Sequence, residues 1–378
     1  MSEWKETTLS EISIINPTEN LVKGIKAKKV NMDVLIPFTK KIPSYSIEEY
    51  KGGMKFRNGD TIIARITPCL ENGKTAYVDF LDDDEIGFGS TEFVVLRKKD
   101  GKSDSHFLYY FALSPDFRDV AILSMTGSSG RQRVQLDVIK NHPFLLPPLP
   151  EQRAIASVLS SLDDKIDLLH RENKTLEAMA EALFRQWFIE EADEGWEEVK
   201  LGDFFPVVTG KRNANFATSD GSYPFFTCSQ SVLKAPSYSF NGAAILLAGN
   251  GDFNIKHYVG KFEAYQRTYV LMPYDTLYFG FLLTLMKYYL FDITKGYQGS
   301  VIDFITKPMI EDFVFLLPKR RDLIKDKLVC FNDLYRKVDV NIFQLHTLEK
   351  LRDTLLPKLM SGEVRVKYEE EGVASCRA

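Results

Sequence analysis

The sequence of 378 residues lacks several features that would assign it to a common class of protein. Its four cysteines, Cys69, Cys228, Cys330 and Cys376, are far apart and form no CxxC pair, so neither a disulfide framework nor a zinc site is predicted. No apolar run has membrane-spanning length, and the polar start MSEWKETTLSE lacks the apolar stretch of a signal peptide. We therefore expect a cytoplasmic protein with no membrane partner.

Catalytic motifs are also missing. An adenine methyltransferase should carry an NPPY-like tetrapeptide and a glycine-rich cofactor loop, and no NPPY-like sequence occurs. Residues 73–75 resemble the end of a P-loop, but Pro68 stands where its first glycine should be. The five histidines show no metal-ligand spacing, and the acidic run 82–85 is more typical of a solvated hairpin turn than of a metal site. We expect no catalysis, metal or cofactor in this chain.

Composition is ordinary for a globular protein, with 44% hydrophobic and 26% charged residues, and the length predicts two or more domains. The net charge of -4 at first argues against a nucleic-acid partner. The acidic excess, however, is concentrated in residues 150–195. Binding of DNA elsewhere in the chain therefore remains possible through local basic patches.

Two segments, residues 149–189 and 320–360, have the heptad pattern of long helices. They align at a constant shift that places Val338 on Ile166, and each carries one asparagine in its seam, a device that selects one register. Pro147, Pro148 and Pro150 should fix the start of the first helix. The predicted coiled-coil seam contains Ile155, Leu159, Leu162, Ile166, Leu169, Asn173, Leu176, Leu183, Phe331, Leu334, Val338, Asn341, Leu345, Leu348 and Leu355.

The segments before the two helices also repeat. The first body opens with WKETTLSEI from Trp4 and the second with WEEVKLGDF from Trp196, and both close with FLLP. Short strands are predicted at residues 61–64, 75–78, 93–96, 243–248, 257–259 and 268–271, and helices at 106–113 and 275–289. We therefore expect two α+β bodies of mixed sheet plus helices.

The duplication predicts a pseudo-two-fold arrangement of two globular domains separated by two long helices in an antiparallel coiled coil. A helix pair roughly 50 Å long, at ~1.5 Å per residue, would hold two similar domains apart along a duplex. The predicted parts are domain 1 at residues 1–149, spacer helix 1 at 150–190, domain 2 at 195–318, spacer helix 2 at 319–361, and a C-terminal strand and tail at 362–378.

Several motifs resemble the specificity subunit of Type I restriction-modification systems. The resemblance runs from Trp4 to about Val366 and rests on FLLPPLPEQRAIASVL and LEKLRDTLLPKLMSGEVRV at the two helices, and on NGDTIIARITPCLENGKTAYV and FNGAAILLAGNGDFNIKHYVGKFEAYQRTYVL in the bodies. One departure is that the second helix begins LLPKRRDL, without the PPLPEQ signature of the first.

This resemblance implies a non-catalytic subunit whose two target recognition domains each read half of a bipartite site in double-stranded DNA. Implied partners are methyltransferase subunits, two in number, which would bind S-adenosylmethionine, and restriction subunits, which would use ATP and magnesium. The alternatives are the specificity subunit of a Type IIB-like restriction enzyme, a coiled-coil scaffold that binds no DNA, and a stand-alone methyltransferase. Half-site centres are expected roughly one helical turn of DNA apart.

Candidate DNA contacts are basic, amide and hydroxyl side chains on glycine-rich loops, because these groups reach base edges and phosphates. The alternative for each is an ordinary mobile surface loop or turn. The candidates in the first body are Arg65, Asn72, Lys74, Ser128, Ser129, Arg131, Gln132 and Arg133. The candidates in the second body are Lys211, Arg212, Asn250, Asn254, Lys256, Gln266, Arg267, Gln298 and Ser300.

Three further expectations concern the rest of the chain. Phe184, Trp187 and Phe188 leave apolar area beyond the seam, which indicates a surface for a partner protein. Gly362 suits a helix C-cap, after which residues 364–366 are predicted to form a strand that returns to the first body. The tail from Tyr368 onward is expected to be disordered.

Overall fold

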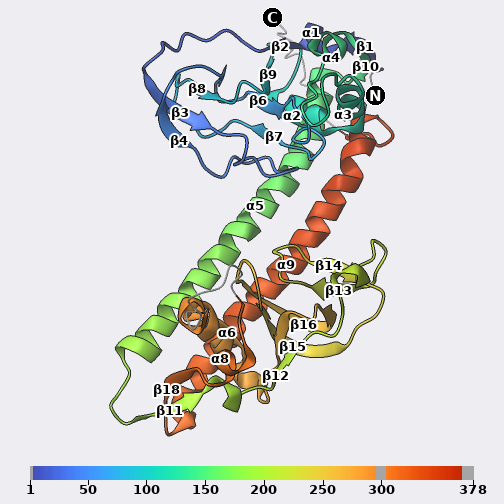
Figure 1. The fold of residues 1–378 in the computed structure, drawn as a ribbon. Coiled ribbons are helices and arrows are strands. Elements are labelled where there is room, and N and C mark those ends of the chain that lie inside the picture. Colours follow the sequence, from blue (N-terminus) through green and yellow to red (C-terminus); the bar gives the residue numbers. More distant parts are fainter. Residues whose placement is uncertain (1–2, 295–303, 368–378) are drawn as a thin grey trace, which may run out of the picture. The chain divides into compact units, whose positions relative to one another are not determined.

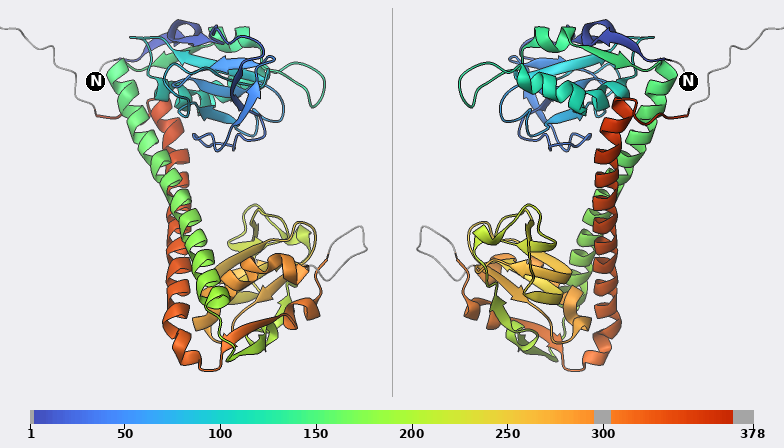
Figure 2. Two further views of the ribbon diagram at one scale, coloured as in Figure 1. Left: turned by 90° about the vertical axis from the view of Figure 1, so that its left-hand side faces the viewer. Right: turned by 90° about the vertical axis from the view of Figure 1, so that its right-hand side faces the viewer.

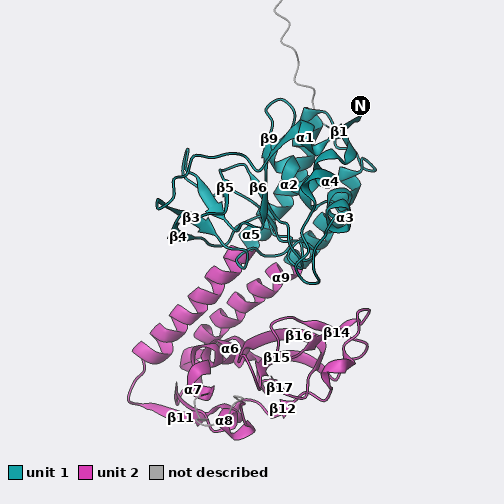
Figure 3. Ribbon diagram, turned by 45° about the horizontal axis from the view of Figure 1, so that its top comes forward, with its two compact units in different colours: residues 1–169, 344–378 teal, residues 170–343 magenta. Residues whose placement is uncertain are grey.

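A computed structural model describes residues 3–294 and 304–367 of the chain. The chain divides into two compact units: unit 1 contains Met1–Leu169 and Gln344–Ala378, and unit 2 contains His170–Phe343 (Figure 3). Each unit joins one body to one half of each long helix. The predicted tail, residues 368–378, lies outside the described residues.

The two long helices are α5, Leu149–Arg185, and α9, Lys325–Met360 (Figures 1 and 2). α5 begins after Pro147 and Pro148, as predicted. Pro150, however, lies inside its first turn, where a missing N–H loses no helix hydrogen bond. The last turn of α5 continues as the wider π-turn η1, Gln186–Glu190. α9 follows the short helix η5, Arg321–Ile324, and so begins at Lys325 rather than at Arg320.

In unit 1 the two helices pack along the predicted seam in opposite directions. Ile166 and Leu169 of α5 cluster with Leu345 and Leu348 of α9. Seam residues from the start of α5 share a core with those from the end of α9, namely Ile155, Leu159, Leu355 and Leu359. Residue numbers rise along one helix as they fall along the other, so the helices are antiparallel here.

In unit 2 the same seam contains the two predicted asparagines. Asn341 is fully buried, and its Nδ2 donates to Asn173 Oδ1 at 2.9 Å. Farther along α5, Ala180 shares a core with Phe331, which comes earlier in α9, so the helices are antiparallel in this unit too. Only one alignment pairs both amides, which explains how they fix the register. The remaining predicted seam residues are buried or half-buried: Leu162, Leu176, Leu183, Phe331, Leu334 and Val338.

The body of unit 1 is built on a central antiparallel sheet with the strand order β2-β9-β6-β7. Side chains of successive residues point to opposite faces of this sheet. Ile63 and Val94 pack towards helix α2, whereas Ile62 and Val95 pack towards a second sheet. Both faces are covered, so the central residues of β6 and β9 are apolar on both faces of the sheet. The elements are α1 Leu9–Ile12, β2 Ser13–Ile15, β6 Thr61–Ala64, β7 Thr75–Tyr77, β9 Phe93–Lys98, α2 Ser105–Leu113, α3 Pro115–Leu123 and α4 Leu136–Asn141.

The second sheet of unit 1 has the order β4-β3-β8-β5, in which β3 and β8 are parallel and the other pairs antiparallel. Its strands are β3 Lys26–Val30, β4 Ser46–Glu49, β5 Met54–Phe56 and β8 Gly87–Gly89. The sheet is mixed, as the sequence predicts.

The body of unit 2 contains one six-stranded sheet with the order β12-β17-β15-β16-β13-β14. Ile245 and Leu271 point to the core that contains α6, and Leu246 and Val270 point to the opposite core. The first four strands repeat the order and pairing of the central sheet of unit 1. The strands are β12 Val207–Thr209, β13 Tyr223–Phe226, β14 Leu233–Ala235, β15 Phe240–Ala248, β16 Ile255–Ala264 and β17 Thr268–Leu271. The helices are η2 Leu201–Asp203, η3 Ala214–Phe216, η4 Thr276–Tyr278, α6 Phe279–Tyr288, α7 Leu290–Thr294 and α8 Lys307–Glu311.

The repeated opening and closing motifs pair with each other within each unit. In unit 1, β1 Lys5–Thr8 pairs with β10 Pro143–Leu146, and in unit 2, β11 Trp196–Lys200 pairs with β18 Val314–Pro318. Lys5 stands opposite Leu146 and Glu197 opposite Leu317, so the two pairs have the same register relative to the repeated motifs. The predicted duplication is confirmed.

The segment after α9 returns to unit 1. Gly362 ends the helix with φ +77°, as predicted for a C-cap. Arg365 Nη2 donates to the buried Glu151 at 2.6 Å, and Trp4 Nε1 donates to the same carboxylate at 3.2 Å. The predicted strand at residues 364–366 is wrong, because these residues are irregular and attach through side chains rather than a backbone ladder.

No helix in the described part of the chain is both long and apolar enough to cross a bilayer.

Candidate nucleic-acid interface

The predicted loop of unit 1, residues 126–133, lies against the turn that carries Arg65. Thr67 N donates to Gln132 O at 3.0 Å, and Val134 N donates to Arg65 O at 2.9 Å. The structure therefore brings the two predicted DNA-binding segments of this unit side by side.

Two of the basic candidates in unit 1 also bond to the protein itself. Lys74 Nζ donates to Met32 O at 2.8 Å, and Arg65 Nη2 donates to Val134 O at 3.4 Å. Both residues are half-buried, so they support the turn as well as adding positive charge to it.

The loop itself presents polar groups to solvent. Gly127 and Gly130 have φ values of +135° and +74°, the left-handed region that favours glycine. Of the predicted readers, Gln132 is half-buried and the exposed ones are Asn72, Ser128, Ser129, Arg131 and Arg133.

Arg133 carries a partner that the sequence did not predict. Its Nε and Nη2 donate to Glu92 Oε1 at 3.0 and 2.6 Å, and these hydrogen bonds lower the pKa of Glu92. The side chains are 45% and 24% exposed, so water screens the pair.

In unit 2, the predicted readers come together where four loops meet. The strand β12 leads into Arg212, whose carbonyl accepts from Gln266 N at 2.9 Å, while Gly249 N donates to Arg267 O at 2.8 Å. The first bond joins the loop after β12 to the turn between β16 and β17, and the second joins that turn to the loop after β15. The four loops are residues 210–212, 227–230, 249–254 and 265–267.

Two candidates in this cluster hold its loops together. Asn254 Nδ2 donates to Cys228 O at 2.9 Å, and Lys256 Nζ donates to the carbonyls of Thr227 and Ser229. Burial lowers the pKa of Lys256. The prediction for both residues remains untested, but the structure gives each a second role in loop packing.

The other candidates in unit 2 differ in exposure. Lys211, Gln266 and Arg267 are exposed, and Asn250 is half-buried. Gln298 and Ser300 lie outside the described residues.

Arg212 has the most elaborate surroundings in the cluster. Its Nε lies 3.4 Å from Oε2 of Glu263, a carboxylate with no exposed surface, and its Cζ lies 4.4 Å from the centre of the Phe216 ring. The residues predicted from the sequence did not include Glu263, Phe216 or Glu92. Glu92 and Glu263 could not be found from a local pattern, because they lie 41 and 51 residues from their arginine partners. Phe216 is only four residues after Arg212, so the spacing of an arginine and an aromatic residue was the one local signal for that contact.

The predicted partner surface at the end of α5 is wrong. Phe184 and Phe188 are 1% and 4% exposed because they pack inside unit 2 against Phe281 of α6, with ring centroids 5.8 and 4.6 Å away. Trp187 is half-buried at the edge of the same core. The apolar area beyond the seam is covered by the body of the chain's own unit.

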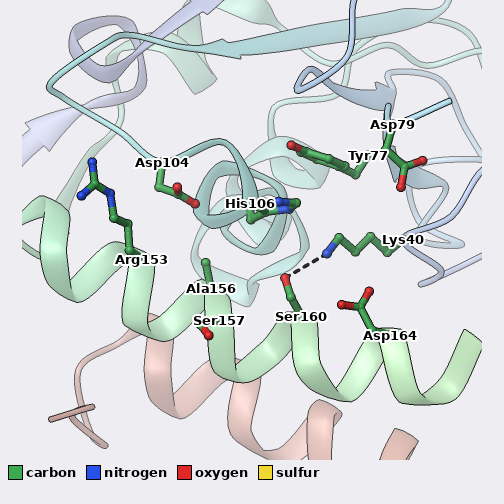
Figure 4. A pocket seen from close by; sticks show the side chains of 10 residues that line it. All are labelled: Lys40, Tyr77, Asp79, Asp104, His106, Arg153, Ala156, Ser157, Ser160 and Asp164. Carbon is green, nitrogen blue, oxygen red and sulfur yellow. Dashed lines mark hydrogen bonds between the residues drawn. The ribbon is translucent and has the colours of Figure 1, made fainter. Parts of the chain in front are cut away.

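Unit 1 also contains a polar pocket of 520 Å³ between its body and α5 (Figure 4). Lys40 Nζ donates to Ser160 Oγ at 2.9 Å and lies 5.6 Å from the Tyr77 ring centre. Burial lowers the pKa of both Lys40 and His106. The other charged groups of the lining are Asp79, Asp104, Arg153 and Asp164. The lining has three carboxylates, and of its two basic side chains, Arg153 and Lys40, Lys40 has a lowered pKa. The pocket is therefore unsuited to a phosphate backbone and lies outside the candidate interface.

The acidic run at residues 82–85 forms a turn in which Lys28 Nζ contacts Asp82 at 3.0 Å and Glu85 at 2.8 Å. Within residues 3–294 and 304–367, no group of three or more His, Cys, Asp or Glu side chains has a geometry that could hold a metal ion.

The sequence profile described as Type I restriction modification DNA specificity domain matches residues 1–178 and 193–322. The chain therefore belongs to this family, and it carries the domain twice.

Relatives agree with this assignment, and a solved structure shares the fold. The chain is 38% identical to the Type I restriction enzyme EcoDI specificity subunit of Escherichia coli over 179 residues, which are 47% of this chain and 40% of that protein. It is 26% identical to the MjaIX specificity subunit of Methanocaldococcus jannaschii over 307 residues, or 70% of each chain. The match thus spans less than half the length of EcoDI. A Type I S subunit from M. genitalium shares the fold, with a TM-score of 0.63, 20% identity, and 94% and 96% of the two chains covered.

Proposed function

We propose that this chain is the DNA-reading specificity subunit of a Type I restriction-modification system and that it binds a bipartite duplex site through the loops of both units. The observation that carries the proposal is that each unit gathers its predicted basic and amide side chains from separate segments onto neighbouring loops. The occurrence of one specificity-domain match in each body supports it further.

The chemistry of the loops suits a duplex. Exposed lysine side chains such as Lys211 are point charges that grip phosphates, whereas the planar guanidinium of Arg212 and the amide of Gln266 match the edges of guanine and adenine. Each unit would read one half-site in this way. The antiparallel helices α5 and α9, which run through both units, would set the distance between the half-sites.

Under this proposal the chain supplies recognition, and catalysis belongs to its partners. Two methyltransferase subunits would bind S-adenosylmethionine, and restriction subunits would use ATP and magnesium. The chain itself would need no cofactor.

Binding to random-sequence duplexes at rising salt tests DNA binding directly. A DNA reader should lose affinity steeply between 50 and 200 mM salt, roughly 10³-fold or more if six or more phosphates are contacted. A coiled-coil scaffold should show no binding at any salt concentration. Uptake of labelled S-adenosylmethionine by the isolated chain would instead indicate a stand-alone methyltransferase.

The sequence that is read can be found by mapping methylated adenines in cells that express the chain with its methyltransferase partner. Two constant half-sites separated by a fixed gap are the expected result. A cleavage pattern on both sides of the site would favour the Type IIB-like alternative.

Insertion of one heptad into both α5 and α9 tests the role of the helices as a spacer. The gap between half-sites should lengthen while the half-sites themselves stay the same. An unchanged gap would contradict the role.

A further inference from the structure

The backbone of Arg212 is fixed by hydrogen bonds to neighbouring segments. It follows Gly210, where a Cβ atom would lie 2.2 Å from Ala264 O, so the loop can approach β16 this closely only without a side chain. Arg212 N then donates to Ala264 O, and Gln266 N donates to Arg212 O. The base of the side chain is therefore fixed on both sides.

Beneath the guanidinium lies a buried carboxylate. Glu263 Oε2 accepts from Ser239 Oγ at 2.7 Å and lies 3.4 Å from Arg212 Nε, and Oε1 accepts from Ala264 N at 3.0 Å. A charge with no exposed surface is costly unless it is paired. Arg212 is its cationic partner, so the side chain is drawn to one orientation.

The third restraint is aromatic. The Phe216 ring centre lies 4.4 Å from Arg212 Cζ, within the distance at which a guanidinium stacks on a ring. Phe216 belongs to η3, which directly follows the loop that carries Arg212. The guanidinium is thus held by a carboxylate at Nε and by an aromatic ring whose centre lies 4.4 Å from Cζ.

The Arg212 side chain remains partly exposed to solvent. The side chain is 43% exposed, and among the described residues its Nη1 and Nη2 atoms donate to no protein acceptor. Exposed neighbours on the same cluster are Lys211, Gln266 and Arg267.

We propose that Arg212 is a specificity-determining residue of unit 2 that reads the O6 and N7 edge of a guanine, and that Glu263 and Phe216 are positioning residues that hold its side chain for this contact. The inference rests on the proposed function, because it requires that unit 2 bind duplex DNA. A fixed planar fork favours two-point recognition of a base edge, whereas a phosphate is bound equally well by the flexible stem of Lys211.

Arg133 of unit 1 differs from Arg212 in which guanidinium nitrogens are bonded to a carboxylate. Glu92 binds both Nε and Nη2 of Arg133, which leaves one terminal nitrogen without that pairing. Glu263 contacts Arg212 through Nε alone, so both terminal nitrogens remain available to a base.

The test is selection of bound sequences from a random duplex library by the full chain, together with its methyltransferase subunits, followed by affinity measurement over a range of salt. Arg212→Ala should remove the preference for guanine at one position of one half-site, by roughly 5- to 150-fold, the range for one two-point contact, and leave the other positions unchanged. Arg212→Lys keeps the charge and should keep the salt slope, yet it should lose the same preference.

Lys211→Ala is the matched control, because it removes an exposed cation next to Arg212. It should weaken binding to all sequences alike, lower the salt slope by about one contact and leave base preference unchanged. If Arg212→Ala behaves in this same way, Arg212 contacts phosphate and the inference is overturned.

The positioning role has its own readout. Glu263→Gln should reduce the guanine preference in the wild-type background and have no effect on it when Arg212 is already alanine. Ser239→Ala removes the other side-chain bond to Glu263 and controls for general loosening of the loop. Loss of preference at several positions in both backgrounds would show that Glu263 acts only on the fold. Absence of any sequence preference in the wild-type complex would instead contradict the proposed function itself.

Discussion

Positions of the two long helices that correspond in the repeat carry an ion pair in unit 1 and apolar or aromatic side chains in unit 2. In unit 1, Asp163 and Arg352 form a nearly buried ion pair at 2.9 Å, and Tyr110 Oη donates to the same carboxylate at 2.7 Å. The constant shift between the helices places Asp163 on Tyr335 and Arg352 on Ala180, which are 2% and 0% exposed in the apolar core of unit 2.

This difference teaches that the duplicated scaffold constrains shape more strongly than polarity. A buried ion pair contributes little net stability over apolar packing of similar volume, but removal of one partner leaves an uncompensated charge. An apolar core has no such partner to lose and instead depends on volume. The two units should therefore respond differently to mutation at matched positions.

The largest effect is expected in the aromatic core of unit 2. Phe184→Ala should lower the free energy of unfolding by about 3–5 kcal/mol, because it opens a cavity beside Phe188 and Phe281. The matched position in unit 1 is Leu356, which is only half-buried, so Leu356→Ala should cost about 2 kcal/mol. Hydrogen exchange resolved by peptide measures each unit separately. Equal effects at the two positions would break the comparison.

A smaller loss is expected when the ion pair of unit 1 is broken. Arg352→Ala should cost about 3 kcal/mol, the lower end for a buried pair because 13% of the arginine side chain is exposed. The double change Asp163→Leu with Arg352→Met should recover part of that loss, since it imitates the apolar core of unit 2 but leaves Tyr110 Oη with only Ser160 Oγ, at 3.4 Å.

The exposed pair Arg336–Asp333 provides the control for this experiment. Its side chains are 72% and 56% exposed, so Arg336→Ala should change the free energy of unfolding by less than about 1 kcal/mol. A double variant in unit 1 that is no more stable than Arg352→Ala alone would show that the ion pair, and not its volume, holds the helices there.

The smallest effect concerns pH and His106 in the polar pocket of unit 1. Burial lowers the pKa of His106, so the unfolded chain binds a proton more readily than the folded chain does. Stability should be complete above the unfolded value of about 6.5 and should decline as pH falls through it. The urea midpoint of unit 1, followed from pH 7.5 to 5.5, should fall less in His106→Phe than in the wild type. Identical slopes would argue against this account.

Local patterns predicted much of the fold. The heptads from Ile155 to Leu183 are revealed by their periodicity. The strands at Ile62 and Val94 are revealed by short runs of β-branched and aromatic residues between turn residues. The repeated WxxxxL and FLLP motifs predicted the duplication. The asparagines of the seam were visible because an amide interrupts an otherwise apolar repeat.

Other features depend on contacts between distant segments, and the sequence could not supply them. Phe184 and Phe188 lie beyond the seam, so the heptad pattern alone left them without a partner, whereas the fold covers them with α6. Residues 364–366 have a strand-like pattern, but this segment is attached by the Arg365 side chain, which donates to the buried Glu151, and not by backbone pairing. The candidate DNA contacts could be selected by residue type and loop position. The contact between Glu263 and Arg212 could not, because it forms only when β16 packs against the loop that carries Arg212.

The short strand pair β11 and β18 has a consequence for how unit 2 can change over time. β11 follows the end of the first long helix and β18 precedes the start of the second, so their pairing holds these two ends of the body side by side. We expect that insertions or deletions in loops between Lys200 and Val314 leave that spacing unaltered, provided that α6 keeps its contacts with Phe184 and Phe188. Loop lengths in this body can therefore vary while the β11–β18 pair keeps the ends of α5 and α9 at one spacing.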